Sequence, residues 1–397
     1  MIKHLIKIVW NRKRTNLLVT VEIFFSFLVL FAVAVIAIYY IDNYRQPLGF
    51  NYQNVWNITV RITSRDSDKD EKNAQIGVFR QVMAGLKDID GIEHIATDFS
   101  SPYSTGNWTT SRKANGRSVE YHQNTVTPDF KDVLDLQVVK GRWFGKDDTG
   151  LDWQPVVITQ KLATDLYGSD DPLGKEIIPG DKPSQRVIGV ISEYRKDGEY
   201  SAPVNFLFQL QDMYQPKSGL PQSFVIKVRP GSNAVLEEKI INTAQSIAKD
   251  WSFHVQPITE MRETMNSVRL APVIAIGLIA GFLMIMVALG LIGVLWQNVT
   301  QRTREIGLRR AKGATAGNIY KQILGELIII ASFGLIVGTI VIAQFPLLDL
   351  VGFVSTRIYV YGFVVSVLII YLLTVLCGLY PSRLATRIHP AAALHYE

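Results

Sequence analysis

The sequence predicts a four-helix transmembrane protein with one large α+β extracytoplasmic domain, inserted between the first and the second span. Three observations support this fold class. Four apolar runs are each long enough to cross a bilayer as a helix of about 20 residues. A polar region of about 230 residues separates the first run from the second. Finally, the chain is 48% hydrophobic with a net charge of +6, and its basic residues gather beside the apolar runs.

The N-terminal region combines a basic segment with the first apolar run. Residues 1–16 alternate basic and apolar residues, which is typical of an amphipathic helix on the cytoplasmic membrane face. Residues 17–40 form the first predicted span, which is too long for a signal-peptide core and has no small-residue cleavage site after it. Glu22 lies about one turn inside this span, so it either reaches back to the interface or makes a polar contact with another helix or subunit.

Residues 41–270 are polar enough that they must fold around a core of their own. Short apolar or alternating stretches predict strands, and apolar residues at helical spacing predict helices. The strands are expected at 55–62, 92–97, 224–228 and 253–255, and the helices at 76–89 and 236–247. These elements make two β-α-β units that flank an inserted, strand-rich lobe of about residues 99–220.

A stalk helix is expected to lead from this domain into the second span. It covers residues 258–270, with Pro257 before it, Thr259 as its cap and Pro272 as the place for a kink. The remaining part of the chain, residues 271–397, is predicted to hold three spans and a cytoplasmic coupling loop. The spans are expected at about 273–296, 327–348 and 359–379, and the loop at 297–325.

Glycines within the predicted spans indicate close helix packing. The second span carries Gly277, Gly281, Gly290 and Gly293. The third carries a G-x-x-x-G pair, Gly334 and Gly338. Small residues at such spacing let helix backbones approach one another in a membrane, without identifying the partner helix.

A very basic segment lies between the second and the third span. Residues 303–314 read T-R-E-I-G-L-R-R-A-K-G-A. Glu305 stands four residues before Arg309, the favourable order for an ion pair on a helix. Gly313 is suited to end that helix, and Thr315 to cap the next one. The segment therefore predicts a short amphipathic helix on the cytoplasmic loop.

Residues 304–314 resemble the motif R-E-I-G-[LI]-R-[RK]-A-x-G-A of the MacB/FtsX-type ABC transporter permeases. Two further regions resemble the same family. Its MacB-like periplasmic core domain is matched by V-T-P-D-F at 126–130, G-R-W-F at 141–144, D-P-L-G-K at 171–175 and V-I-G-V at 187–190. The tail of its FtsX-like permease domain is matched by P-S-R-L-A at 381–385 and P-A-A-A-L at 390–394.

The resemblance implies particular roles for residues of the loop and the spans. The loop would dock onto a separate ATPase subunit through Arg304, Glu305, Ile306, Gly307, Arg309, Arg310, Ala311, Gly313 and Ala314. Polar contacts in the membrane are expected from Glu22, Gln322 and Glu326, the last of which matches a glutamate common in the family. The permease would work as a homodimer or as a heterodimer with a second permease.

The sequence lacks the motifs of several chemistries. An ATP-binding loop needs G-x-x-x-x-G-K-[ST], and the nearest approach, residues 141–147, is one residue short and has no hydroxyl. No H-E-x-x-H or G-x-S-x-G motif occurs, and Cys377 is the only cysteine. We therefore expect a non-enzymatic subunit without a cofactor of its own, with ATP and magnesium bound by a partner ATPase. Nucleic-acid binding is disfavoured because the basic residues flank the spans.

Charge also predicts the topology. The N-terminus, the loop and the C-terminus are basic and should face the cytoplasm, which puts the large domain outside the inner (plasma) membrane. In a Gram-negative cell this side is the periplasm, and the sequence does not fix the type of cell. The resulting hypothesis is a permease that couples ATP hydrolysis to movement of its outer domain, for export or efflux, with membrane lipid around it and a periplasmic adaptor and outer-membrane channel as further partners.

Two alternatives remain open at this stage. Within the same family, the protein would regulate cell-wall hydrolases or release lipoproteins. In another class, it would be a membrane sensor or scaffold, which needs a separate output partner because only about 18 residues follow the last span.

Overall fold

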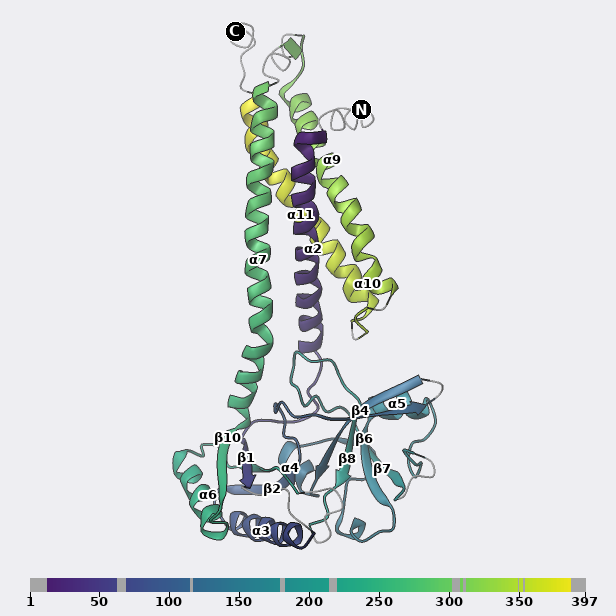
Figure 1. Cartoon of the computed structure of the whole chain (residues 1–397), viewed down its shortest axis with the longest axis vertical. Coiled ribbons are helices and arrows are strands. Elements are labelled where there is room, and N and C mark those ends of the chain that lie inside the picture. Colours follow the sequence, from purple (N-terminus) through teal and green to yellow (C-terminus); the bar gives the residue numbers. More distant parts are fainter. Residues whose placement is uncertain are drawn as a thin grey trace. The chain divides into compact units, whose positions relative to one another are not determined.

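The computed structural model describes residues 13–62, 69–114, 117–178, 183–213, 220–301, 308–309, 312–348, 350–352 and 354–386. The chain divides into two compact units. One unit is Asp42–Arg269, and the other combines Met1–Ile41 with Leu270–Glu397. Two long helices, α2 (Lys13–Tyr44) and α7 (Ile258–Gln301), run through the boundaries between the units (Figure 1).

We call Asp42–Arg269 the outer unit and the other unit the membrane unit. The described part of the membrane unit contains four long helices. Besides α2 and α7 these are α9 (Ala316–Ile342) and α11 (Thr356–Thr386), with the short α10 (Gln344–Leu347) between them. All four are long and apolar enough to cross a bilayer, which confirms the predicted four-span fold class. The fourth helix begins at Thr356, so Arg357 lies inside it and not in the preceding turn.

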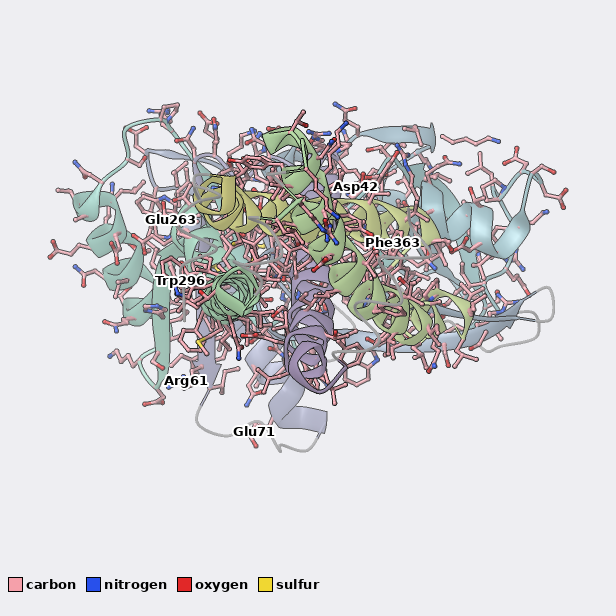
Figure 2. All side chains as sticks on the ribbon, turned by 90° about the horizontal axis from the view of Figure 1, so that it is seen from above. Asp42, Arg61, Glu71, Glu263, Trp296 and Phe363 are labelled. Carbon is pink, nitrogen blue, oxygen red and sulfur yellow. The ribbon has the colours of Figure 1, made fainter. Side chains whose placement is uncertain are left out.

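One apolar core joins these helices. Its buried members come from all four, among them Phe27 on α2, Leu291 on α7, Ala331 on α9 and Ile370 on α11. Phe363 of α11, labelled in Figure 2, contacts Phe27 of α2 in a T-shaped, edge-to-face arrangement, with 6.2 Å between the ring centroids and 77° between the ring planes. Side-chain packing therefore holds the spans of this unit together.

Three of the predicted packing glycines lie at close helix contacts. A Cβ atom at Gly334 would come within 3.0 Å of the Thr20 carbonyl oxygen on α2, and one at Gly338 would overlap the Phe27 ring. A Cβ at Gly290 would overlap the Glu22 carboxylate. The G-x-x-x-G pair therefore packs against the first span of its own chain.

The other three glycines have a different environment. In the part of the chain that the structure describes, no atom lies within 4 Å of a Cβ built at Gly277, Gly281 or Gly293. Large apolar side chains beside them, such as Leu278 and Phe282, are 71% and 62% exposed. This face of α7 is therefore free to meet lipid or another protein.

The outer unit contains the two predicted β-α-β units, and they interlock. The elements are β1 (Val55–Ile62), α3 (Lys69–Lys87) and β2 (Ile92–Asp98), then β9 (Ser223–Val228), α6 (Ala234–Ile247) and β10 (Trp251–Pro257). The strands lie in the order β10-β1-β9-β2, each antiparallel to its neighbour, which is the ferredoxin-like arrangement. Helices α3 and α6 share one apolar core on this sheet.

Between β2 and β9 the chain forms the inserted lobe. Its elements are β3 (Trp108–Ala114), β4 (Arg117–Val126), α4 (Phe130–Leu134), β5 (Val138–Gly141), η1 (Lys146–Asp148), β6 (Gln154–Thr159), α5 (Gln160–Tyr167), β7 (Gln185–Ile191) and β8 (Phe206–Leu210). The strands continue the same sheet in the order β4-β8-β6-β7-β5, and β3 pairs with β4. In the strand register a single residue pair, Asp98 opposite Val126, joins the lobe to the ferredoxin-like half, and we call this place the joint.

The start of the stalk differs from the prediction in one detail. Helix α7 begins at Ile258, whose side chain is fully buried, so Thr259 lies in the first turn and is not the cap. The apolar side chain of Ile258 belongs to the core of the outer unit, and this packing sets where the helix begins. Pro272 lies inside α7, which continues through it.

We predict that Gly338→Ala lowers the thermal unfolding temperature of the detergent-solubilised protein. The added methyl group has no room beside Phe27, and overpacking of this kind costs about 1–3 kcal/mol. Gly293→Ala is the matched control, since its Cβ meets open space. Equal unfolding temperatures for the two variants, measured by differential scanning fluorimetry, would refute the tight contact between α9 and α2.

Candidate functional site

The turn before α9 has the geometry that the sequence indicated. Gly313 has a φ of 94°, in the left-handed region that closes helices. The Ala314 amide donates to the Arg309 carbonyl at 3.0 Å, the long backbone bond of a Schellman motif. Thr315 then caps α9 by accepting a hydrogen bond from the Asn318 amide at 3.3 Å. The roles of Gly313 and Thr315 as helix end and helix cap are confirmed.

Arg309 is connected to α9 by side-chain hydrogen bonds. Its Nη1 donates to Oε1 of Gln322, and Nε2 of Gln322 donates to Oε1 of Glu326 at 3.4 Å. Glu326 is only 8% exposed, so its carboxylate lies inside the helical unit. This chain of three polar groups, which we call the loop relay, links the basic loop to the first turns of α9.

The remaining predicted loop contacts lie outside the described residues. These are Arg304, Glu305, Ile306, Gly307, Arg310 and Ala311. The expected pair of Glu305 with Arg309 therefore stays a prediction. At the other candidate position, the half-buried Glu22 of α2 lies against Gly290 of α7, where the missing side chain leaves room for the carboxylate. The contact brings two spans of the same unit together.

A second site lies in the outer unit and was not indicated by the sequence. It is the segment 193–201 after β7, which we call the clasp. Arg195 is 1% exposed, and its Nη1 donates to the carbonyls of Asn43 and Gln46, both at 2.9 Å. Its Nη2 donates to the Glu199 carbonyl at 2.6 Å. A guanidinium at the last turn of α2 satisfies carbonyls that a helix end leaves without partners.

The clasp also binds the first turns of α7. The Glu199 carboxylate accepts a hydrogen bond and an ion pair from Nε of Arg262. Tyr103 donates a longer hydrogen bond of 3.4 Å to the same carboxylate. The Arg262 guanidinium also lies over the ring of Tyr52, 4.9 Å from its centroid. One segment thus holds the end of α2 and the beginning of α7.

The clasp is anchored to the sheet by an aromatic ring and a lysine. The Tyr194 ring lies 4.7 Å from Phe206 and 5.0 Å from Phe208, measured between centroids. Lys196 is 2% exposed, and its Nζ donates to the carbonyls of Ser104 and Gly106 at 2.9 and 2.7 Å. Burial lowers the pKa of Lys196 to about 8, although nearby carboxylates favour its charged form.

Asp98 stands at the joint of the sheet. It is fully buried, and it accepts hydrogen bonds from Ser101 Oγ at 3.0 Å and from Ser223 Oγ. Its other oxygen, Oδ2, has no hydrogen-bond partner among the described residues. Burial raises the pKa of Asp98 to about 6, against the effects of both serines and of Lys196. The joint therefore contains a carboxyl group that titrates near neutral pH.

Comparison with known families adds two matches. The model of the MacB-like periplasmic core domain matches residues 26–243, and that of the FtsX-like permease C-terminal region matches residues 277–390. The first covers more than half of the chain, and the residues between the two matches, 244–276, include the beginning of α7.

Curated relatives are permeases. The chain is 27% identical over 342 residues to the uncharacterized ABC transporter permease YknZ of Bacillus subtilis, covering 79% of this chain and 78% of YknZ. It is 27% identical over 287 residues to the macrolide export ATP-binding/permease protein MacB of Chromobacterium violaceum, covering 68% of this chain and 43% of that protein. The chain thus spans less than half the length of MacB.

Two solved structures align with part of the chain. The periplasmic region of MacB from Actinobacillus actinomycetemcomitans aligns with a TM-score of 0.37 and 18% identity, covering 54% of this chain and 94% of that structure. The extracellular domain of YknZ from Gram-positive bacteria aligns with a TM-score of 0.35 and 17% identity, covering 50% and 99%.

We predict that Asp98→Asn makes the stability of the protein less dependent on pH. The folded-state pKa of about 6 lies above the unfolded value of about 3.9, so the wild type gains stability as pH falls through 6 and loses it as pH rises. The full difference corresponds to about 3 kcal/mol, of which about 1.4 kcal/mol develops between pH 7.5 and pH 5. Unfolding temperatures of the full chain at these two pH values measure that part.

Asp90→Asn serves as the control for the pH experiment. The Asp90 side chain is 80% exposed, so its replacement should leave the pH dependence as in the wild type. If Asp98→Asn and Asp90→Asn gave the same pH profile, Asp98 would not be the group that titrates at the joint.

Proposed function

Since this chain belongs to the MacB/FtsX-type ABC transporter permeases, we propose that it passes the force of ATP hydrolysis from a partner ATPase to its outer domain, for export or efflux. The permeases of this type are non-catalytic subunits, and the four spans and the outer domain are those of the family. The observation that carries the proposal is the clasp, because residues 193–201 bind both α2 and α7.

The energy source is proposed to be a separate ATPase subunit, with ATP and magnesium bound there. No ATP-binding loop motif occurs in the 397 residues. YknZ, which is similar over most of its length, is named as a permease, whereas MacB is named as an ATP-binding/permease protein and is matched over 43% of its length. These names support the proposal that the region of similarity is the permease part and that the ATPase is a separate subunit.

Docking is proposed at the basic loop, on the cytoplasmic side with both termini. The loop relay supports this, because Arg309 connects the loop directly to α9 through Gln322 and Glu326. A displacement of the loop would move α9, which packs on α2 through Gly334 and Gly338. The coupling contacts at Arg304, Glu305, Ile306, Gly307, Arg310 and Ala311 belong to the same proposal.

The transporter is further proposed to be a dimer of permease subunits, with an adaptor and an outer-membrane channel as additional partners. The open glycines and exposed apolar side chains of α7 support a second permease on that face. Substrate would be moved by the outer domain from outside the inner membrane, because four spans per subunit leave little room for a wide pore.

We expect a P-loop ATPase to co-purify with the tagged chain from its native membranes in mild detergent. Changing Arg309, Arg310 and Lys312 together to glutamate should reduce its recovery by about tenfold or more, because charged contacts at interfaces are worth several kcal/mol. Native mass spectrometry of the eluate also gives the number of permease and ATPase subunits. Arg229→Glu, on the outer unit, is the control for a loss of positive charge.

Recovery of the dimer without any ATPase would overturn the transporter function and favour a sensor or scaffold. If the loop variant recovered as much ATPase as the wild type, the transporter function would be kept and the proposed docking site would be wrong.

The clasp leads to a separate prediction, that Arg262→Gln uncouples ATP hydrolysis by the complex from the movement of the outer domain. The variant should keep the ATPase rate of the complex within about twofold, while the difference in amide hydrogen exchange of the outer domain between ATP and ADP states is lost. The reason is that α7 loses its ion pair with Glu199. Glu199→Gln should act in the same way, and the double variant should add little, since both remove one interaction.

Arg229→Gln is the control for this experiment, because Arg229 makes an exposed ion pair with Asp90 on another part of the outer unit. An ATP-dependent exchange difference that persists in both clasp variants would contradict the proposed transmission through the clasp.

A further inference from the structure

The inserted lobe contains a cavity of about 560 Å³, a volume in the range of small-molecule sites. It lies on the face of the sheet that α5 covers, beyond the part that the helix reaches. The described residues that line it come from β4, β6 and β8, from residues 148–151, and from Phe99, Trp108, Trp153, Pro183 and Asp212. None of them belongs to the clasp or to the loop relay.

The floor of this cavity is formed where the side chains on one face of the strands change from apolar to amide. On β4, the positions that face α5 run from Val119 and Tyr121, which are buried in the core with α5, to Gln123, which lines the cavity. On β8 the same face changes from Leu207 to Gln209. The aliphatic part of the sheet is covered by α5, and the amide part is left as a floor.

A third amide completes this floor from β6. Gln154 precedes the buried Val156 on the same strand face and lines the cavity. Val156 stands opposite Gln209 in the strand register, so Gln154 lies close to the other two amides on the sheet. Three neighbouring strands therefore each contribute one glutamine.

The amides have hydrogen-bonding capacity to spare. Gln209 is only 9% exposed, and its Nε2 donates to Oε1 of Gln123 over 3.5 Å, the long limit of a hydrogen bond. Gln154 accepts an equally long bond from Gln185. Since each amide has two donor hydrogens and an acceptor oxygen with two lone pairs, these long bonds use only part of its capacity.

Aromatic rings form the walls of the cavity. Phe99 and Trp108 meet edge to face with 6.0 Å between centroids, and Trp108 is 56% exposed. Trp153 lines the cavity from the loop before β6, and the Arg186 guanidinium lies 5.7 Å from its ring centroid. Exposed rings beside an amide floor suit a ligand with one flat apolar face and several hydroxyl groups.

The charges favour a neutral ligand over an anionic one. No lysine or arginine is among the described residues that line the cavity, and Arg186, which lies over Trp153, is already paired with Glu176 at 3.5 Å. The Asp148 carboxylate at its edge is already neutralised, accepting from Arg142 Nη2 at 2.7 Å and from the Gly145 amide at 2.8 Å. Asp212 adds a carboxylate acceptor suited to hydroxyl groups.

From these features we propose that the cavity is a binding site for a neutral saccharide of one or two rings. The apolar face of a sugar ring stacks on Trp153 or Trp108, and its hydroxyl groups bond to Gln123, Gln154 and Gln209. The site gives the outer domain a means to recognise a glycan of the cell envelope. It goes beyond the transport function, and it does not depend on an ATPase.

The test is isothermal titration of the full chain in lipid nanodiscs, prepared without glycoside detergents because their sugar headgroups would occupy the site. The probes are maltose, cellobiose and diacetylchitobiose, with glucuronate as an anionic comparison. At least one neutral disaccharide should bind with a dissociation constant of about 1 mM or tighter, and glucuronate at least about tenfold more weakly.

Two variants test the residues of the site. Trp153→Ala should weaken binding at least about tenfold, and Trp153→Tyr should restore most of it by keeping a stacking face. Gln209→Leu keeps the size of the side chain but removes the amide, and it should have an effect of similar size. Gln137→Leu, an exposed position of the same lobe outside the cavity, is the control.

Absence of binding for every neutral probe up to about 10 mM would overturn the proposal. Binding that persists unchanged in both Trp153→Ala and Gln209→Leu would overturn it as well, as would tighter binding of glucuronate than of any neutral probe. ATPase association is read in a different experiment, so either result leaves the transport function to be judged separately.

Discussion

The arrangement of the outer unit depends on burying charged side chains in the clasp. Arg195, Lys196 and Glu199 are between 1% and 6% exposed, and a buried charge is tolerated only when hydrogen bonds or an opposite charge replace its water. Arg195 and Lys196 donate to backbone carbonyls, and Glu199 accepts from Arg262. Because loss of one partner leaves the other buried and uncompensated, the segment is held in one conformation, with the end of α2 and the start of α7 bound to it.

The same reasoning explains why the two halves of the sheet behave as one body. Only Asp98 and Val126 pair in the strand register across the joint, which is a short backbone connection for a ten-stranded sheet. Side chains strengthen it, since Oδ1 of Asn124 on β4 accepts from the Phe99 and Ser100 amides, and Oγ1 of Thr127 accepts from the Thr97 amide. Lys196 of the clasp fixes the 104–107 turn next to this joint. Polar contacts around the joint therefore connect both halves of the sheet with the clasp.

How far the sequence predicts this structure depends on whether the signal is local. Strands such as 55–62, helix α6 and the cap at Thr315 were predicted because alternation, helical spacing and capping residues occur within a few neighbouring positions. The clasp was missed because its sequence, E-Y-R-K-D-G-E-Y, has the composition of an exposed loop. Its burial results from contacts more than 60 residues apart in the chain, as for Glu199 with Arg262 and Arg195 with Asn43. The cavity of the lobe was missed for the same reason.

Helix length explains why the polar contacts lie where they do. With a rise of about 1.5 Å per residue, the 32 residues of α2 and the 44 of α7 are about 48 and 66 Å long, more than the roughly 30 Å of a bilayer core. In the middle of the spans apolar packing, such as Phe27 against Phe363, holds the helices together. Charged and amide groups contact these helices nearer their ends: the loop relay in the first turns of α9, and the clasp at the end of α2 and the beginning of α7.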